Sequence, residues 1–312
     1  MHEHIAPALY YLQVHLLYAS LVCVAAWGLT SLLPGSATAK YWIWVATAVN
    51  FAVPLGGFFD EFGALHIAWA SQLSLLGDLG VGISRNATVA AVLCVVWALG
   101  AILLITRLWL RIRVERGDAA GMTPQDPVEI GRSFLAQGVP VRFATPGQSP
   151  AVEGVLRPHI SLPRGIERLL SEQELDAVLI HELTHAKRRD NLIRLVYEVG
   201  LCALWFHPLV WLTGSRLALY RELSCDESVI RSARGEQLVS ALAKLASPQD
   251  ASVLRATASS FISHRLARLT EAQPGRMYVA ANILLTVVFA VVVLAGIFET
   301  IAHTPSCFRV RG

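Results

Sequence analysis

Long uncharged stretches alternate along this chain with one segment of mixed polarity. The first uncharged run extends over Ile5–Ala39, and three more cover Tyr41–Phe59, Thr88–Thr106 and Met277–Phe298. A helix needs roughly 20 apolar residues to cross the hydrocarbon core of a bilayer. A single run could be the core helix of a soluble domain. Four runs in one chain predict membrane-spanning helices near residues 8–33, 41–59, 88–106 and 277–298.

The segment between the third and fourth runs has the patterns of a folded domain. Val139–Phe143 and Val152–Leu162 are rich in β-formers and flank a turn region with Pro146, Gly147 and Pro150, so we expect a pair of strands. Ser171 followed by Glu174 has the form of a helix capping box. Apolar residues then recur at helical spacing, which predicts an amphipathic helix. Residues 117–127, rich in Gly, Pro and Asp, are interpreted as a linker.

Composition supports the membrane interpretation. Hydrophobic residues make up 54% of the 312 residues and charged residues only 16%, whereas soluble domains carry about 25% charged residues. The first run has no preceding Lys or Arg and is long for a signal peptide, so we expect it to be retained. A net charge of +3 without a dense basic patch gives no indication of nucleic-acid binding. No metal-ligand spacing or disulfide framework is indicated by the five cysteines: Cys23, Cys94, Cys202, Cys225 and Cys307.

Charge placement predicts the orientation in the membrane. Arginines cluster after the third run and before the fourth, and cytoplasmic loops carry such an excess. Residues 111–276 are therefore expected in the cytoplasm, with the turn at 34–40, while the N-terminus, the 60–87 loop and the C-terminal tail are expected outside. Arg309 and Arg311 in that tail run against the rule. The predicted domains are three spans in residues 1–110, a cytoplasmic domain in 111–276, and a span with a short tail in 277–312.

The amphipathic helix carries His181 and His185, which are four residues apart and share one face. This spacing lets two imidazoles bind one Zn²⁺. Glu182 stands beside them, where it can take a proton from a zinc-bound water. The alternative is a surface helix with two solvated histidines. The cap and the apolar face favour the metal site.

A catalytic zinc usually has a third protein ligand. Glu222 and Asp226, again four apart, are the candidates: Glu222 as ligand, and Asp226 as acceptor of the free N–H of a ligating histidine. Both could instead be surface carboxylates. Glu227 competes for the ligand role, but it is rotated away from the face that Glu222 and Asp226 share.

The uncharged segment Val199–Ser215 lies between the two halves of this site. If it crossed the bilayer, Glu222 and His181 would lie on opposite sides, so we expect a re-entrant or interfacial hairpin interrupted by Pro208. His207 is a candidate for stabilising the oxyanion or shaping the site, or else a polar residue at a buried bend. Cys225 is interpreted as a small core residue, with a reactive thiol as the alternative.

These motifs together resemble the BlaR/MecR-like membrane metallopeptidases. The resemblance rests on Gly154–Pro163 (G-V-L-x-P-x-I-x-L-P), HELTH followed by Arg188-Arg-Asp190, the W-F-x-P-L-V-W bend, and the R-E-x-x-x-C-D-E run. It implies a gluzincin-type site with zinc on His181, His185 and Glu222, Glu182 as base, and Asp226 in support. The fold class that follows is mostly α: a multi-pass helical membrane protein with an α+β zincin-like domain inserted between the third and fourth spans.

The resemblance also implies signalling in a bacterial cytoplasmic membrane. Members of the family sense a β-lactam outside and cleave a cytoplasmic transcriptional repressor, often with cleavage of their own chain. Here only Thr300–Gly312 follow the last predicted span, where antibiotic-sensing members carry a penicillin-binding domain. We therefore expect that this chain does not sense a β-lactam covalently, and that detection involves the 60–87 loop, the spans or a separate sensor partner. His207 stands where the family often has Asn.

The expected partners are thus the lipid bilayer and a protein substrate, for which a winged-helix repressor is the candidate. The predicted strands could bind an extended substrate at a sheet edge, or only pack against the helix. Two other functions stay open. One is a housekeeping membrane protease resembling the CAAX-type prenyl proteases, and the other is a non-catalytic signalling scaffold with a relic zinc site.

Overall fold

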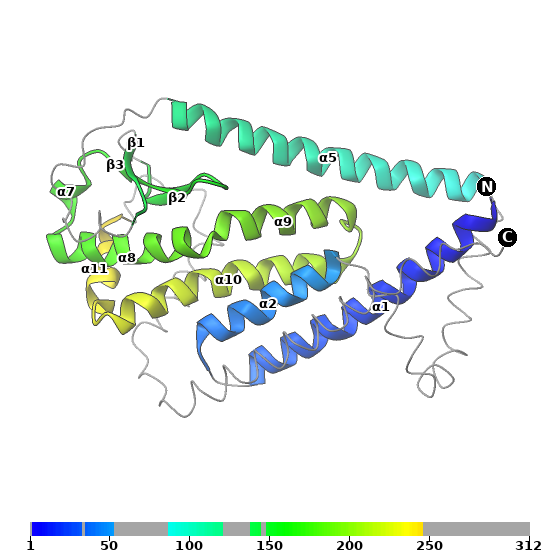
Figure 1. Cartoon of the computed structure of the whole chain (residues 1–312), viewed down its shortest axis with the longest axis horizontal. Coiled ribbons are helices and arrows are strands. Elements are labelled where there is room, and N and C mark those ends of the chain that lie inside the picture. Colours follow the sequence, from blue (N-terminus) through cyan, green and yellow to red (C-terminus); the bar gives the residue numbers. More distant parts are fainter. Residues whose placement is uncertain (1, 33–34, 53–86, 121–137, 145–147, 246–312) are drawn as a thin grey trace.

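The computed structural model describes residues 2–32, 35–52, 87–120, 138–144 and 148–245 of the chain. Helices dominate it, and a small sheet lies at one end (Figure 1). The predicted fourth span and almost all of the predicted 60–87 loop lie outside these residues. In chain order the elements are α1 (His2–Leu32), α2 (Ala37–Ala52), α5 (Ala87–Ala120), β1 (Val141–Ala144), β2 (Ala151–Glu153), β3 (His159–Pro163), α7 (Ile166–Leu169), α8 (Glu172–Arg188), α9 (Asp190–Ala203), α10 (Pro208–Arg231) and α11 (Gly235–Leu245).

Two helices among the described residues are long and apolar enough to cross a bilayer. These stretches are His15–Leu32 in α1 and Thr88–Val114 in α5, which coincide with the first and third predicted spans. Along α5 large apolar side chains are exposed, for example Leu99 at 62% and Leu103 at 69%. Contiguous exposed apolar surface is unfavourable in water, so α5 is suited to lipid. The described part of α2 has 16 residues, fewer than the roughly 20 of a span, so the second span stays a prediction.

The predicted linker begins too early. Residues 117–120 continue α5, which the structure follows to Ala120. Ala119 and Ala120 are strong helix formers and offset the cost of Gly117 within the helix. The rest of the predicted linker lies outside the described residues.

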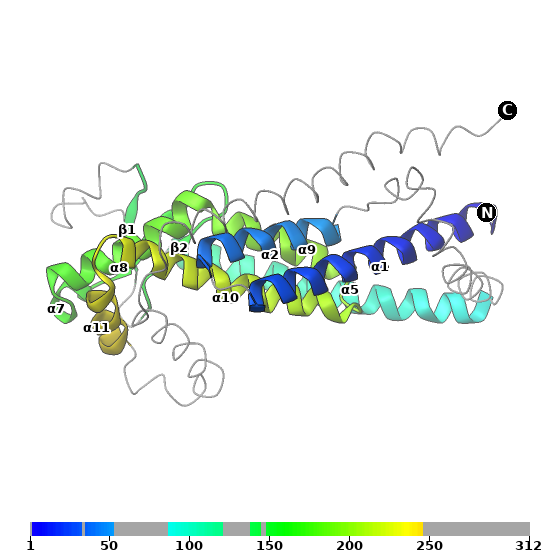
Figure 2. The same cartoon turned by 90° about the horizontal axis from the view of Figure 1, so that it is seen from below.

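α2 lies between α1 and α10 and joins them in one packed core, here called the helical core (Figures 1 and 2). Trp44 and Tyr41 are its largest fully buried side chains. The polar side chains of Thr47 and Thr213 are also fully buried, and each donates to a carbonyl one turn earlier in its own helix. The other fully or nearly buried apolar residues are Ala19, Cys23, Ala26, Ala37, Ile43, Phe51, Val210, Leu217, Tyr220 and Leu223.

The sheet corrects the predicted strand pair. Its strand order is β1-β3-β2, with β1 parallel and β2 antiparallel to β3. The single strand expected over Val152–Leu162 is wrong, because the chain turns between β2 and β3. Gly154 has φ +83°, and a Cβ there would lie 2.6 Å from the carbonyl oxygen of Arg157, so only glycine fits the turn.

A second core, here called the sheet core, packs α8 against the sheet and α11. The predicted capping box is confirmed: the Ser171 side chain accepts from the Glu174 N–H, and the Glu174 carboxylate accepts from the Ser171 N–H at 2.7 Å. That carboxylate also accepts from Lys244 of α11 at 2.7 Å. One side chain thus fixes both the start of α8 and the position of α11. The buried apolar members of this core include Ile160, Leu162, Leu175, Val178, Leu179, Leu183, Val229 and Leu238.

The segment expected to fold back does so as a helical hairpin. α9 ends at Ala203 and α10 begins at Pro208, where proline suits the first helical turn because its missing N–H has no intrahelical role there. The Tyr197 hydroxyl donates to the carbonyl of Val210 at 2.9 Å and lies against Gly214, where a Cβ would be 2.0 Å from it. The hairpin therefore brings α10 back beside α8, the helix that carries His181 and His185. Its association with a membrane stays a prediction.

Candidate metal centre

The two histidines of α8 face the same point. His181 and His185 are 5% and 9% exposed, and their Nε2 atoms lie 3.2 Å apart. Glu182, also 9% exposed, makes no hydrogen bond or ion pair with the residues that the structure describes. The opposite side of the helix packs into the sheet core, which fixes the direction of the histidine face.

α10 brings Glu222 to this point. Its Oε2 atom lies 3.5 Å from Nε2 of His181 and 3.7 Å from Nε2 of His185. Its other oxygen, Oε1, accepts from Nε and Nη2 of Arg221 at 3.1 and 2.9 Å. One oxygen is therefore directed at the histidines while the other is held away from them.

The three atoms form a triangle that fits a zinc ion. Its sides are 3.2, 3.5 and 3.7 Å. Ligand atoms around a tetrahedral zinc with bonds of about 2.0–2.1 Å are separated by about 3.3–3.4 Å. The set His181, His185 and Glu222 thus has both the donor chemistry and the spacing of a catalytic zinc site.

A carboxylate supports each histidine from behind. Asp226 Oδ1 lies 3.0 Å from Nδ1 of His181, and Asp190 Oδ2 lies 2.6 Å from Nδ1 of His185. Each ring therefore turns Nδ1 to a carboxylate and Nε2 to the shared point. Such partners fix the tautomer and raise the basicity of a histidine ligand.

The electrostatics of the centre favour a cation. Burial lowers the pKa of His181, but the carboxylates of Asp226 and Glu222 outweigh burial and raise this pKa to about 9. Burial also lowers the pKa of His185, but Asp190 outweighs burial and raises this pKa well above its ordinary value. Burial would raise the pKa of Glu222, but the two histidines beside its carboxylate hold this pKa well below its usual range. Positive charge is thus stabilised where the three side chains meet.

Asp190 is held in turn by residues that the sequence analysis did not identify as part of the site. The Tyr41 hydroxyl of α2 donates to Asp190 Oδ1 at 2.8 Å, and Nε of Arg188 donates to the same oxygen at 2.6 Å. The Arg188 guanidinium lies 4.0 Å from the centroid of the Tyr41 ring. A helix of the helical core therefore contacts the residue that orients His185. The charged run Arg188-Arg-Asp190 directly after the histidine was the available signal.

Cys225 and Glu227 have roles beside the centre. Cys225 is fully buried, with Sγ 3.5 Å from Nδ1 of His185, which agrees with a small buried residue. The Glu227 carboxylate turns to the start of α2 and accepts from the Ser36 hydroxyl, the Thr38 N–H and the Thr38 hydroxyl at 2.9, 2.9 and 2.8 Å. It therefore caps α2 and does not compete with Glu222.

His207 does not join the centre, which corrects the prediction that it shapes the site. It stands before the first residue of α10, and at 1.5 Å per residue Glu222 lies roughly 22 Å further along that helix. Its Nε2 lies 3.2 Å from the Ser20 hydroxyl of α1, and its ring is tilted against Phe51 of α2 with centroids 5.4 Å apart. The proline that follows places His207 at the hairpin turn, at the end of α10 remote from the metal centre.

Comparison with known proteins supports this reading of the geometry. The model of the family described as BlaR1 peptidase M56 matches residues 71–269, more than half of the chain. Regulatory protein BlaR1 of Bacillus licheniformis is 29% identical over 175 residues, which cover 53% of this chain and 28% of that protein. The methicillin resistance mecR1 protein of Staphylococcus aureus (strain Mu50) is 19% identical over 175 residues, or 53% and 30%. A protease HtpX homolog of Thermococcus sibiricus is 29% identical over 122 residues, or 35% and 40%. The chain thus spans less than half the length of each relative.

Proposed function

Because the chain belongs to the BlaR1 peptidase M56 family, we propose that it is a membrane-embedded zinc metalloendopeptidase whose zinc is bound by His181, His185 and Glu222. The triangle of ligand atoms, with sides of 3.2 to 3.7 Å, carries this proposal. A zinc ion bound there would supply a Lewis acid for the scissile carbonyl and would lower the pKa of a water molecule.

Glu182 is the proposed general base. It takes a proton from the attacking water and later delivers that proton to the leaving amine. Its carboxylate lies close enough to raise the pKa of His181 and makes no hydrogen bond with the residues that the structure describes. Asp190 and Asp226 keep the two histidines in the orientation that directs Nε2 at the shared point.

β2 is the proposed docking edge for an extended substrate. The Asn191 side-chain amide donates to the carbonyls of Val152 and Gly154 at 2.9 and 3.2 Å, which fixes β2 beside the junction of α8 and α9. β3 pairs with β2 on one side. On the other side Asn191 already occupies the carbonyls of Val152 and Gly154, so a substrate strand added there would share these acceptors. The alternative is that the sheet only packs against α8, and the same contacts agree with that alternative.

The proposed setting is a bacterial cytoplasmic membrane with residues 111–276 facing the cytoplasm. The two long apolar helices support a membrane location. In α5 the arginines follow the uncharged run Thr88–Thr106, and Arg111 pairs with Glu198 of α9, the helix that begins at Asp190 beside the metal centre. The spans expected at 41–59 and 277–298 belong to this proposal.

The proposed substrate is a cytoplasmic transcriptional repressor, for which a winged-helix protein is the candidate. We also propose that the protease cleaves its own chain. The names of two relatives, a regulatory protein and a methicillin resistance protein, support a signalling role. A separate sensor partner belongs to the same proposal. A second candidate is a membrane protease without a signalling role, resembling the CAAX-type enzymes, and the match with a protease HtpX homolog favours it. A signalling scaffold with a relic zinc site would not need Glu182.

Substitution of Glu182 tests the enzyme proposal. Glu182→Gln should retain zinc but lose peptide cleavage by about 10²–10⁴-fold, the usual contribution of a general base. Glu222→Gln should lose zinc as well. Zinc content by elemental analysis and cleavage of a fluorogenic peptide would be measured together. The matched control is Glu172→Gln, an exposed carboxylate in the first turn of the same helix. Full cleavage by Glu182→Gln would exclude this mechanism.

The two candidate substrates are separated by a trapping experiment. Glu182→Gln protein would be expressed in the native host, and the accumulated full-length proteins would be compared with wild type by mass spectrometry. Accumulation of one DNA-binding repressor supports signalling, whereas accumulation of many membrane proteins supports the second candidate. No accumulated protein would favour the scaffold.

A further inference from the structure

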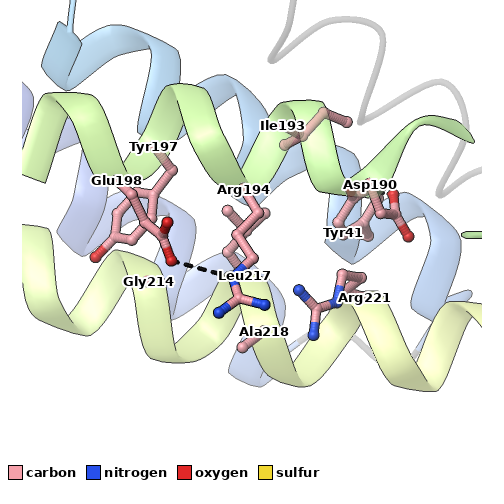
Figure 3. Close-up of a pocket in the computed structure, with 10 residues that line it drawn as sticks. All are labelled: Tyr41, Asp190, Ile193, Arg194, Tyr197, Glu198, Gly214, Leu217, Ala218 and Arg221. Carbon is pink, nitrogen blue, oxygen red and sulfur yellow. Dashed lines mark hydrogen bonds and ion pairs between the residues drawn. The ribbon is translucent and has the colours of Figure 1, made fainter. Parts of the chain in front are cut away.

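A cavity of about 290 Å³ lies between α9 and α10, with α2 behind it (Figure 3). Arg194, Tyr197 and Glu198 line it from α9, Arg221 lines it from α10, and Tyr41 from α2. It lies behind Asp190, on the side of His185 that faces away from Glu222. The peptidase chemistry proposed above does not use it.

Two guanidinium groups face one another across this cavity. Arg194 from α9 and Arg221 from α10 point into it from opposite helices (Figure 3). Arg194 donates through Nε to Glu198 at 3.0 Å, and Arg221 donates through Nε and Nη2 to Glu222. Nη1 and Nη2 of Arg194 and Nη1 of Arg221 have no hydrogen-bond partner among the residues that the structure describes. N–H groups of Arg194 and Arg221 that donate to no described residue thus point into the same cavity.

The carboxylates nearby do not neutralise both arginines. Glu198 is shared, because both of its oxygens also accept from Arg111 of α5. Glu222 directs its second oxygen to the histidines. An anion with several acceptor oxygens would satisfy the remaining N–H groups and reduce the repulsion between the two guanidinium groups.

The cavity lies where the exposed surface of the hairpin changes from apolar to charged. Beyond Arg194, towards the hairpin turn, Val196, Val199 and Trp211 are 49%, 57% and 45% exposed. On the other side, Arg111 stands near the end of the apolar stretch of α5 and reaches Glu198 at the cavity. Arginines at such a boundary lie at the level of the lipid headgroups.

We propose that this cavity binds a phosphate-bearing anion between Arg194 and Arg221, and that in the membrane this anion is the headgroup of an anionic phospholipid. The cavity has room for a phosphate group with part of a glycerol backbone. Free phosphate shares the chemistry and is the second source. The proposal depends on the arginine geometry and the membrane setting, and it is independent of peptidase activity.

Lipid binding to the full chain tests the proposal. Protein purified in neutral detergent would be titrated with phosphatidylglycerol, phosphatidylcholine or inorganic phosphate and observed by native mass spectrometry. Wild type should bind one phosphatidylglycerol about tenfold more tightly than phosphatidylcholine. Arg194→Gln should remove this preference, since a charge-assisted hydrogen bond accounts for roughly a tenfold change. Arg194→Lys, which keeps the charge, should retain part of it.

Arg216→Gln is the matched control, since it removes an arginine of α10 that does not line the cavity. It should bind phosphatidylglycerol as wild type does, and thermal unfolding would verify that all variants fold. Saturation by inorganic phosphate that excludes phosphatidylglycerol would assign free phosphate as the source. Equal losses in Arg194→Gln and Arg216→Gln would overturn the site. Displacement of the lipid by an acidic peptide but not by phosphate would also overturn it, in favour of a carboxylate ligand.

Discussion

The helical core and the sheet core both bury apolar side chains but differ in their polar members and in what lies exposed beside them. In the helical core, polar side chains such as Thr47 and Thr213 are fully buried, while α5 beside it exposes large apolar residues. In the sheet core the order is that of a soluble protein, with Leu162 and Leu179 buried and charged residues such as Glu172 exposed. The two cores thus differ in what they bury and in what lies exposed beside them, and the candidate metal centre lies where they meet.

The two histidines are supported from different helices. Both project from α8 of the sheet core. His185 is oriented by Asp190, which Tyr41 of the helical core holds in turn, whereas Asp226, from the same helix as Glu222, supports His181. A disturbance of α2 should therefore reach the metal through His185 first.

The largest effect is expected from a substitution that leaves a cavity in the sheet core. Leu179 is 1% exposed on the buried face of α8. Leu179→Ala should destabilise the domain by about 2–5 kcal/mol, because it leaves a cavity behind the zinc helix. Leu156→Ala removes the same atoms from a side chain that is 73% exposed, and should change stability by less than about 0.5 kcal/mol. Chemical unfolding in detergent, followed by fluorescence, would measure both; similar values would contradict the assignment of this core.

The sheet-core half of the centre was accessible from the sequence. The capping box, the apolar repeat and the spacing of His181 and His185 are local patterns, and the structure agrees with each. The argument that one zinc needs its ligands in one compartment predicted the fold-back that brings Glu222 close. The break in the strand at Gly154 was also local, since glycine and Pro158 stand within the run, but the β-rich composition on both sides obscured it.

An intermediate effect is expected when either carboxylate that supports a histidine is replaced. The two substitutions allow the supports of His185 and His181 to be compared directly. Asp190→Asn and Asp226→Asn should each weaken zinc binding by about 10–100-fold, the usual cost of removing such a partner. Asp190→Asn should also lower the melting temperature of the helical core, because Tyr41 and Arg188 lose a charged acceptor. Zinc affinity would be measured by competition with a chelator and stability by thermal unfolding. An equal loss of stability in both variants would contradict the separate attachment of the histidines.

The helical-core half was not accessible from the sequence. Tyr41 lies in an uncharged run, where its hydroxyl looks like one polar group among many, and Asp190 is far from it along the chain. Their contact arises only because α2 packs against α9 and α10, and apolar periodicity does not specify which faces of buried helices meet. The same limit applies to Glu227, whose partners at the start of α2 are even more distant in sequence.

The smallest expected effect comes from the hydrogen bond between Tyr41 of α2 and Asp190. Tyr41→Phe removes the hydroxyl that donates to Asp190 at 2.8 Å and leaves the buried ring in place. A hydrogen bond to a charged group contributes about 1.5–3 kcal/mol, and Arg188 still holds Asp190. We therefore expect zinc affinity to fall by about tenfold or less. Tyr220→Phe is the control, since its hydroxyl lies in the same core and donates to the carbonyl of Thr30 at 3.4 Å. A lower zinc affinity in Tyr41→Phe alone would show that the helical core acts on the metal through His185, and equal affinities in the two variants would show that it does not.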